Sequence, residues 1–141
     1  MNIREEIKKY NYYLAKIERL TMEIHELENQ IINLKSPTID GMPRAKGFSE
    51  SKIEEKLIQN DEKITQKKQE IQRIRDILNI LDALINTLKK DQRVIIKTRY
   101  VENADIQEIA DGKYKEYRTI QKTIDVAINN MQESYDSMKS T

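Results

Sequence analysis

The stretch that decides the fold runs from Ile53 to Leu88 and reads IEEKLIQNDEKITQKKQEIQRIRDILNILDALINTL. Its inward positions recur at alternating steps of four and three residues, which is the heptad pattern of a coiled coil. These positions are Ile53, Leu57, Asn60, Ile64, Lys67, Ile71, Ile74, Leu78, Leu81, Ile85 and Leu88. The stretch therefore predicts one long helix that packs against another along a narrow seam.

Two of those inward positions, Asn60 and Lys67, are polar. Buried polar residues at heptad positions can fix the register or the number of partner helices. The other reading is a tolerated, partly hydrated stretch of the seam, and this is the one we expect.

The segment before residue 36 supplies a partner helix of similar length. Its apolar residues follow the same steps, except for two successive threes around Ile17 that indicate a phase slip. They are Ile3, Ile7, Tyr10, Leu14, Ile17, Leu20, Ile24, Leu27, Ile31 and Leu34. Both prolines and two of the three glycines fall between Ser36 and Ser49, which predicts a break there. An antiparallel helical hairpin follows, formed by helices at 1–35 and 50–90 and a linker at 36–49.

The composition excludes several classes of protein. Only 38% of the 141 residues are hydrophobic and 35% are charged, which suits elongated helices better than a large compact core. Cysteine is absent, so disulfides, thiolate zinc sites and cysteine nucleophiles are excluded. His25 is the only histidine and is expected to point to solvent. We predict no catalytic residue, no metal site and no cofactor.

The charge and the apolar runs bear on location and partners. No apolar run is long enough for a membrane span or a signal peptide, so we expect a cytoplasmic protein that does not bind membranes. The net charge is only +1, so any attraction to nucleic acid must come from a local patch. A lone two-helix hairpin leaves apolar edges uncovered, so we also expect self-association through the coiled coil.

The pattern changes near the C-terminus, where shorter helices are predicted. Asp91 is a candidate N-cap for a helix, and Asp105 with Glu108 has the form of a capping box for another of about two turns. Gly112 follows where that helix should end, and a longer helix is predicted from Glu116 or Tyr117. Short helix, turn and longer helix form the outline of a helix-turn-helix, placed at 91–132 with a polar tail at 133–141.

The charge of this outline is unevenly distributed. Residues 105–111 carry three acids and no base, whereas residues 113–122 carry four bases and one acid, a net +3. In a helix-turn-helix the N-terminal part of the second helix enters the major groove, where basic and amide side chains meet phosphates and base edges. The candidate DNA-binding residues are Lys113, Lys115, Glu116, Tyr117, Arg118, Gln121 and Lys122. A charged, solvated corner between packed helices is the alternative reading of the same residues.

Residues 84–128 resemble region 4 of bacterial sigma factors and related small phage regulators. The residues that carry the resemblance are Leu84, Leu88, Arg93 to Ile96, Arg99, Tyr100, Glu102, Glu108 to Ala110, Thr119, Ile120 and Ala127. The turn departs from the family pattern, with Lys113 at a usually apolar position, Tyr114 at a usual glycine and Glu116 at a usual serine. The linker "DGMP" and its flanking helices are also similar to RinA-like and ArpU-like phage late-gene regulators.

The resemblance implies an all-α, sequence-specific DNA-binding transcription regulator of phage or prophage origin. It would activate late genes in a bacterial host cell by binding double-stranded promoter or operator DNA, with host RNA polymerase as a candidate partner. An adaptor or structural coiled-coil protein that binds a partner protein such as RNA polymerase, and no DNA, is the alternative.

Overall fold

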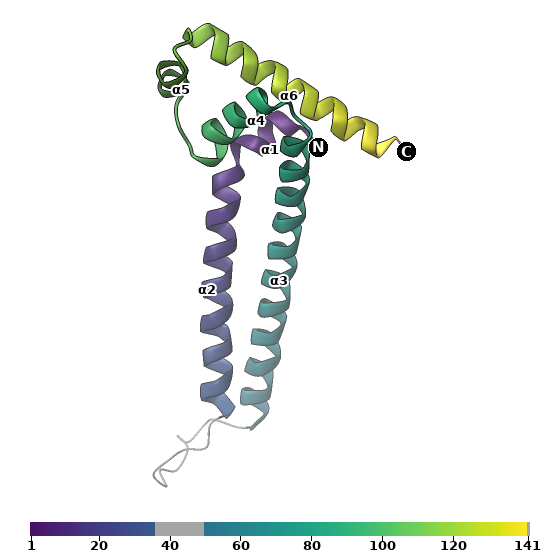
Figure 1. The fold of residues 1–141 in the computed structure, drawn as a ribbon. Helices are drawn as coiled ribbons and strands as arrows, with labels where there is room; N and C mark the ends of the chain where they lie inside the picture. The colour runs from purple at the N-terminus through teal and green to yellow at the C-terminus, as the bar shows by residue number, and fades with distance from the viewer. Residues whose placement is uncertain (36–49, 141) are drawn as a thin grey trace. The chain divides into compact units, whose positions relative to one another are not determined.

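The computed structural model describes residues 1–35 and 50–140, and every element within these ranges is helical (Figure 1). The elements are α1 (Ile3–Lys8), α2 (Tyr10–Lys35), α3 (Glu50–Asn86), α4 (Lys90–Ile96), the π-helix η1 (Lys97–Val101), α5 (Ile106–Lys113) and α6 (Tyr117–Lys139). The predicted all-α class is confirmed. The predicted linker at 36–49 lies outside the described residues.

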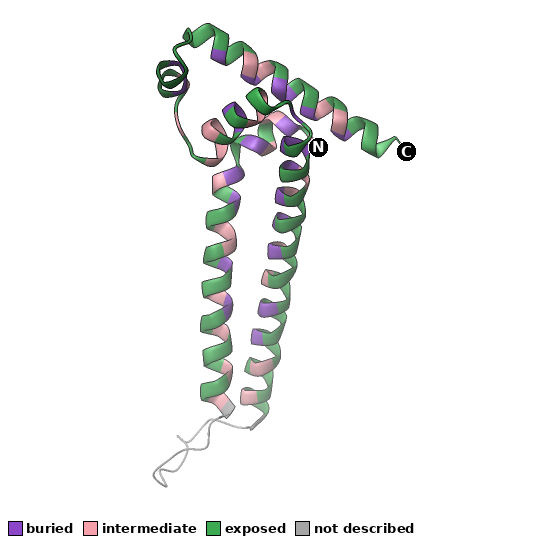
Figure 2. Cartoon of the chain, in the orientation of Figure 1, coloured by how far each residue is buried: buried purple, intermediate pink, exposed green. Residues whose placement is uncertain are grey.

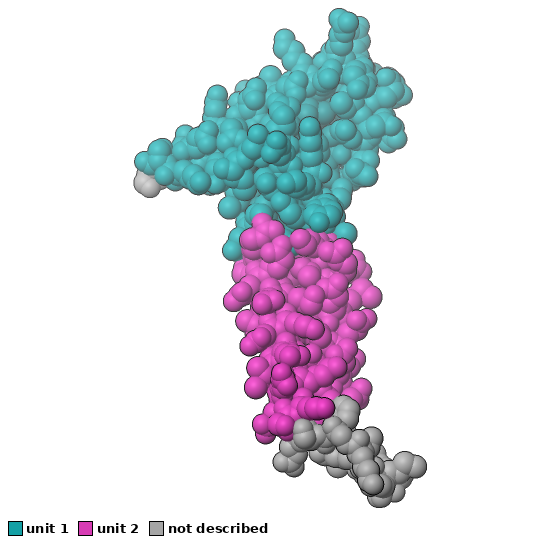
Figure 3. Space-filling view, turned by 180° about the vertical axis from the view of Figure 1, so that it is seen from behind, with its two compact units in different colours: residues 1–15, 74–141 teal, residues 16–73 magenta. Residues whose placement is uncertain are grey.

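The chain divides into two compact units (Figure 3). Unit 2 comprises residues 16–73, which hold most of α2 and the first part of α3. Unit 1 comprises residues 1–15 and 74–141. It holds the start of α2, the end of α3 and all the other helices described. The first helix segment and the C-terminal helices, which the sequence assigned to separate domains, therefore share one unit.

In unit 2, α2 and α3 run antiparallel. Three cross-helix pairs fix their direction, because residue numbers rise along one helix as they fall along the other. The pairs are Lys16 with Glu70 (3.2 Å), Glu23 with Lys67 (2.7 Å) and Gln30 with Asn60 (3.3 Å). The predicted antiparallel hairpin is present in this unit.

The two polar seam positions differ from each other. Asn60 is only 2% exposed, and its Nδ2 donates a hydrogen bond to Gln30 Oε1. The expected hydrated stretch is therefore wrong for Asn60. Lys67 is half-buried, and its ammonium forms an ion pair with Glu23, so this position fits the expectation. The hydrogen bond of a buried amide to one partner favours a single register of the hairpin.

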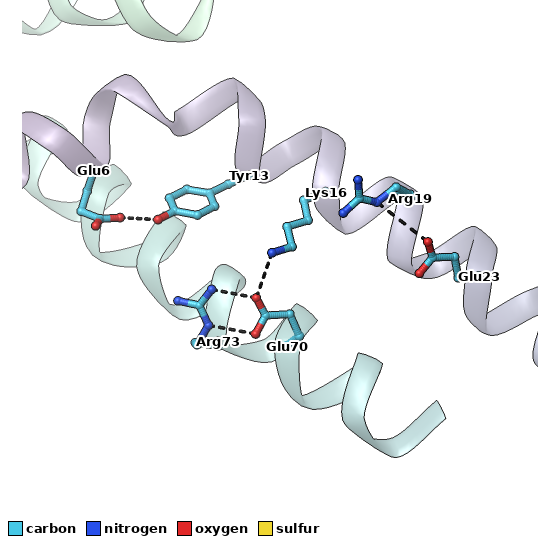
Figure 4. Close-up of polar contacts among 7 residues, drawn as sticks. All are labelled: Glu6, Tyr13, Lys16, Arg19, Glu23, Glu70 and Arg73. Atoms are coloured by element: carbon cyan, nitrogen blue, oxygen red, sulfur yellow. Dashed lines mark hydrogen bonds and ion pairs between the residues drawn. The ribbon is translucent and has the colours of Figure 1, made fainter. Parts of the chain in front are cut away.

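An ion-pair cluster on unit 2 centres on Glu70 (Figure 4). Arg73 donates to both carboxylate oxygens of Glu70, at 3.0 and 2.7 Å, and Lys16 lies 3.2 Å away. Hydrogen bonds from Arg73 and then from Lys16 lower the pKa of Glu70 to about 2. The cluster therefore keeps its charge well into the acid range.

The N-terminal seam departs from the predicted phase in unit 1. The first helix stops at Lys8, and α2 begins at Tyr10 after the C-cap residue Lys9. Because of this break, Tyr10 and Tyr13 are buried, whereas Leu14 is 45% exposed. The predicted seam position of Leu14 is wrong.

Tyr10 gives unit 1 a pH-dependent contribution to stability. Its hydroxyl donates to Asp82 Oδ1 at 2.8 Å, and burial, then this hydrogen bond, raise the pKa of Tyr10 to about 12. The neutral phenol is thus favoured in the folded state, so its contribution is complete below pH 10 and is lost as the pH rises through 12. We expect Tyr10→Phe to lower the free energy of unfolding by about 1 kcal/mol at pH 7. Urea denaturation should show this difference shrinking towards pH 12, and a constant difference would contradict the assignment.

The end of α3 lies four residues before the predicted end at Lys90. Thr87 donates from both its backbone N–H and its hydroxyl to the carbonyl of Leu84, at 3.1 and 2.6 Å, and so closes the helix after Asn86. The next helix, α4, begins at Lys90 with Lys89 as N-cap and no side-chain cap. The predicted capping role of Asp91 is therefore wrong, although Asp91 lies in the first turn of α4.

The longest helix of the C-terminal part, α6, extends through the predicted polar tail at 133–141 to Lys139. Its buried residues line one side of the helix (Figure 2): Ile120, Ile124, Ala127, Ile128, Met131 and Tyr135. Helix α6 is contacted by α1, α4 and α5. The apolar stripe continues to Tyr135, which explains why the helix does not end at residue 132.

Candidate nucleic-acid interface

The short helix α5 has a side-chain cap at its N-terminus. Asp105 is the N-cap, and its carboxylate accepts a hydrogen bond from the backbone N–H of Glu108 at 2.9 Å. Ile109 and Ala110 are buried, and α5 packs on α6. The predicted capping role of Asp105 is confirmed.

The residues just before α5 are held by the π-helix η1. The guanidinium of Arg99 donates to the carbonyl of Ala104 at 3.0 Å, across a bend in which Asn103 has a φ of 62°. The carbonyl of Tyr100 accepts a hydrogen bond from Asn11 Nδ2 at 2.8 Å. Arg99 thus ties η1 to the residue that precedes the N-cap of α5.

The turn between α5 and α6 is a Schellman motif centred on Tyr114. Tyr114 N–H donates to Asp111 O at 3.3 Å and Lys115 N–H to Ala110 O at 3.0 Å, while Tyr114 takes the left-handed conformation with φ 54° and ψ 42°. This is the pairing by which a helix commonly ends, although glycine usually holds the left-handed position. Gly112 instead lies inside α5, so its predicted role as the helix end is wrong.

Helix α6 begins where the sequence predicted. Glu116 is the N-cap with extended backbone, and its carbonyl accepts from the N–H groups of Thr119 and Ile120. Its side chain makes no capping hydrogen bond. The positive end of the helix dipole is therefore left without a side-chain cap at this exposed start.

All seven predicted DNA-binding residues are exposed around the end of α5, the turn and the start of α6. At about 100° per residue, Arg118 and Lys122 lie one turn apart on the face of α6 away from buried Ile120 and Ile124. Gln121 lies on the flank of that face, whereas Tyr117 lies near the direction of the buried stripe and is 45% exposed at the helix start. Lys113 ends α5, and Lys115 and Glu116 lie in the turn. The structure therefore brings the seven together on one exposed region of unit 1.

The basic side chains of this region have no partner among the described residues. Within residues 1–35 and 50–140, Lys113, Lys115, Arg118 and Lys122 make no hydrogen bond or ion pair. Figure 1 shows α5 close to the start of α6, on which it packs. Four unpaired cations are thus displayed beside the start of a supported helix.

Two contacts between α1 and α6 lie close to this region and were not predicted from the sequence. Asp125 lies one turn beyond Gln121, and its carboxylate pairs with Arg4 of α1 at 2.9 Å, which offsets an acid next to the basic region. Ile3 N–H also donates to Gln132 Oε1 at 2.8 Å, so α1 is held against α6 at two points. These pairs join residues more than 120 positions apart. No local sequence pattern signals them.

Metal-binding clusters and membrane-spanning helices are absent from the described ranges. No group of three histidine, cysteine, aspartate or glutamate side chains among residues 1–35 and 50–140 is placed to hold a metal ion. None of the helices described is long and apolar enough to cross a membrane. Comparisons of the chain with models of protein families, with characterised proteins and with solved structures found no match.

Proposed function

We propose that the protein is a transcription regulator that binds duplex DNA with the start of α6. The observation that carries the proposal is a set of four exposed cations with no partner in the described part of the chain. They lie at the end of α5, in the turn and on the first turns of α6. Helix α5, fixed by its Asp105 cap and its packing on α6, supports this start as the first helix of a helix-turn-helix supports the second. The regulatory part of the proposal rests on the resemblance to sigma region 4 and the phage regulators.

The positions of the side chains suggest different roles in binding. Lys113, Lys115 and Lys122 would mainly contact phosphates, which position a protein on DNA without reading its sequence. Tyr117, Arg118 and Gln121 would approach base edges, because arginine can grip guanine in two places and glutamine can do so with adenine. Glu116 would accept a hydrogen bond from the amino group of cytosine.

Binding by the full-length chain is the direct test. We expect affinity for a random-sequence duplex to fall steeply as salt rises from about 50 to 200 mM, because phosphate contacts release counterions. Selection of bound fragments from a random pool should then yield a preferred site, and a palindromic site would indicate that two copies bind together. No binding, or binding without any preferred site, would defeat the proposal and favour an adaptor that binds RNA polymerase or another protein.

Arg118→Ala separates reading of bases from binding of phosphate. We expect a loss of about 1 to 3 kcal/mol on the selected site and a relaxed preference at one base pair, measured by competition with single-position variants of that site. Lys122→Ala, one turn away on the same face, is the matched control and should weaken binding equally on all sequences. It should also reduce the salt slope by about 1. An equal loss on all sequences for Arg118→Ala would reassign Arg118 to phosphate.

A further inference from the structure

Tyr114 has a backbone conformation that L-residues with bulky side chains rarely adopt. Only Asn103 and Tyr114, among the non-glycine residues of the described ranges, have positive φ. Asparagine tolerates the left-handed region because its short side chain bonds locally, whereas a tyrosine Cβ crowds the following carbonyl. Glycine at position 114 would close the same Schellman motif without that strain.

The tyrosine ring packs on none of the described parts of the chain. Tyr114 is 97% exposed, the highest value among the large hydrophobic residues described as exposed. It makes no side-chain hydrogen bond within the described residues. Schellman motifs often include an apolar contact made by the next residue, but here that residue is the exposed Lys115. Strain without a compensating contact is characteristic of residues kept for binding.

We propose that Tyr114 is a DNA-contact residue whose hydroxyl donates a hydrogen bond to a phosphate oxygen of the duplex. The inference rests on the proposed function. Tyr114 lies between Lys113 and Lys115, two cations that pair with no described residue and are suited to neighbouring phosphates. It belongs to the turn rather than to the start of α6, so it lies outside the segment that would enter the groove.

The Schellman motif gives this contact a rigid base. Both hydrogen bonds of the turn fix the backbone on either side of Tyr114, so the ring moves only about its own two side-chain torsions. A tyrosine held in this way contributes contact area and a donor at a small cost in conformational entropy. The turn thereby fixes the direction of the Cα–Cβ bond of Tyr114 before DNA arrives.

The test compares three full-length variants, Tyr114→Phe, Tyr114→Gly and Gly112→Ala. Gly112 lies within α5, and a Cβ added there meets no described atom within 4 Å apart from its chain neighbours and its own helix backbone. Gly112→Ala is therefore the control that stabilises the end of α5 without touching the proposed contact. We expect Tyr114→Gly and Gly112→Ala to raise the urea midpoint, because one relieves strain and the other removes a helical glycine. Tyr114→Phe should leave the midpoint unchanged.

The DNA affinity of the variants should depend on whether the Tyr114 hydroxyl is present and not on their urea midpoints. Tyr114→Phe and Tyr114→Gly should each weaken binding about fivefold on selected and random duplexes alike, the change expected for one hydrogen bond of about 1 kcal/mol. The slope of log affinity against log salt should stay the same, since tyrosine carries no charge. Gly112→Ala should bind like the wild type.

Wild-type binding is measured first, so that two kinds of failure are kept apart. A wild type that binds no DNA overturns the proposed function and this inference with it. A wild type that binds, with Tyr114→Phe equally tight, overturns the phosphate contact alone, whether or not Tyr114→Gly is weaker. A loss confined to one DNA sequence would also overturn it, because a phosphate contact carries no base preference.

Discussion

Replacing Lys113, Lys115 and Lys122 together by alanine should weaken binding to any duplex DNA several hundredfold at about 0.1 M salt. Each phosphate contact contributes about 0.9 to the slope of log affinity against log salt, so three contacts contribute about 2.7. Relative to 1 M salt, a slope of 2.7 corresponds to an affinity roughly 500-fold higher at about 0.1 M salt. This is the affinity that the variant should lose. Fluorescence anisotropy of a labelled random duplex at several salt concentrations measures both quantities.

The three lysines are exposed and unpaired within the described residues, so the variant should unfold at the same urea concentration as the wild type. Lys56, Lys63 and Lys68 provide a matched control, because these exposed lysines of α3 also make no pair there. Their replacement by alanine changes the net charge equally. If this control weakens binding as much as the test variant, attraction arises from overall charge and not from the region around the start of α6.

The elements that could be predicted from sequence are those fixed by local patterns. The unbroken heptad steps of α3 predicted its inward face, where Ile64, Ile71 and Leu81 are buried. The capping role of Asp105 and the start of α6 beside Glu116 followed from residue types at short spacing. Each of these features is specified by residues within or next to one helix, so it does not depend on tertiary contacts.

The features that escaped prediction depend on tertiary contacts or on departures from residue preference. The break at Lys9 that exposes Leu14 accompanies the packing of α1 on α6, a contact between opposite ends of the sequence. Tyr114 in the left-handed conformation contradicts the preference that pointed to Gly112 as the helix end. A local rule assigns the turn to the glycine, whereas α5 continues to Lys113 and the left-handed position falls on Tyr114.

The same distinction applies to the candidate interface. Exposure of its seven residues could be predicted because the apolar stripe of α6, including Ile120 and Ile124, assigns the remaining positions to solvent. The pairing of Asp125 with Arg4 could not, since it depends on where α1 docks. Sequence therefore located the exposed basic region, but it did not reveal that α1 offsets the acid beside it.

Ile120→Ala should lower the free energy of unfolding by about 2 to 5 kcal/mol, the usual cost of a large-to-small change in a packed core. Ile120 is 0% exposed in the first turn of α6, the helix that α1, α4 and α5 all contact. Urea denaturation followed by circular dichroism measures the loss, and Thr119→Ala at the adjacent exposed position should change it by less than about 0.5 kcal/mol.

The site of the change makes Ile120→Ala informative about function as well as stability. Ile120 lies between Arg118 and Lys122 but on the opposite face, so truncation removes no proposed DNA contact and acts only through the support of the helix. Hydrogen exchange should quicken in both α5 and α6, because these helices pack on each other. Exchange that quickens in α6 alone, with a loss below about 1 kcal/mol, would mean that α5 does not brace the start of α6. A helix-turn-helix cannot present a fixed reading helix without that brace, so such a result would count against the DNA-binding proposal before any DNA is added.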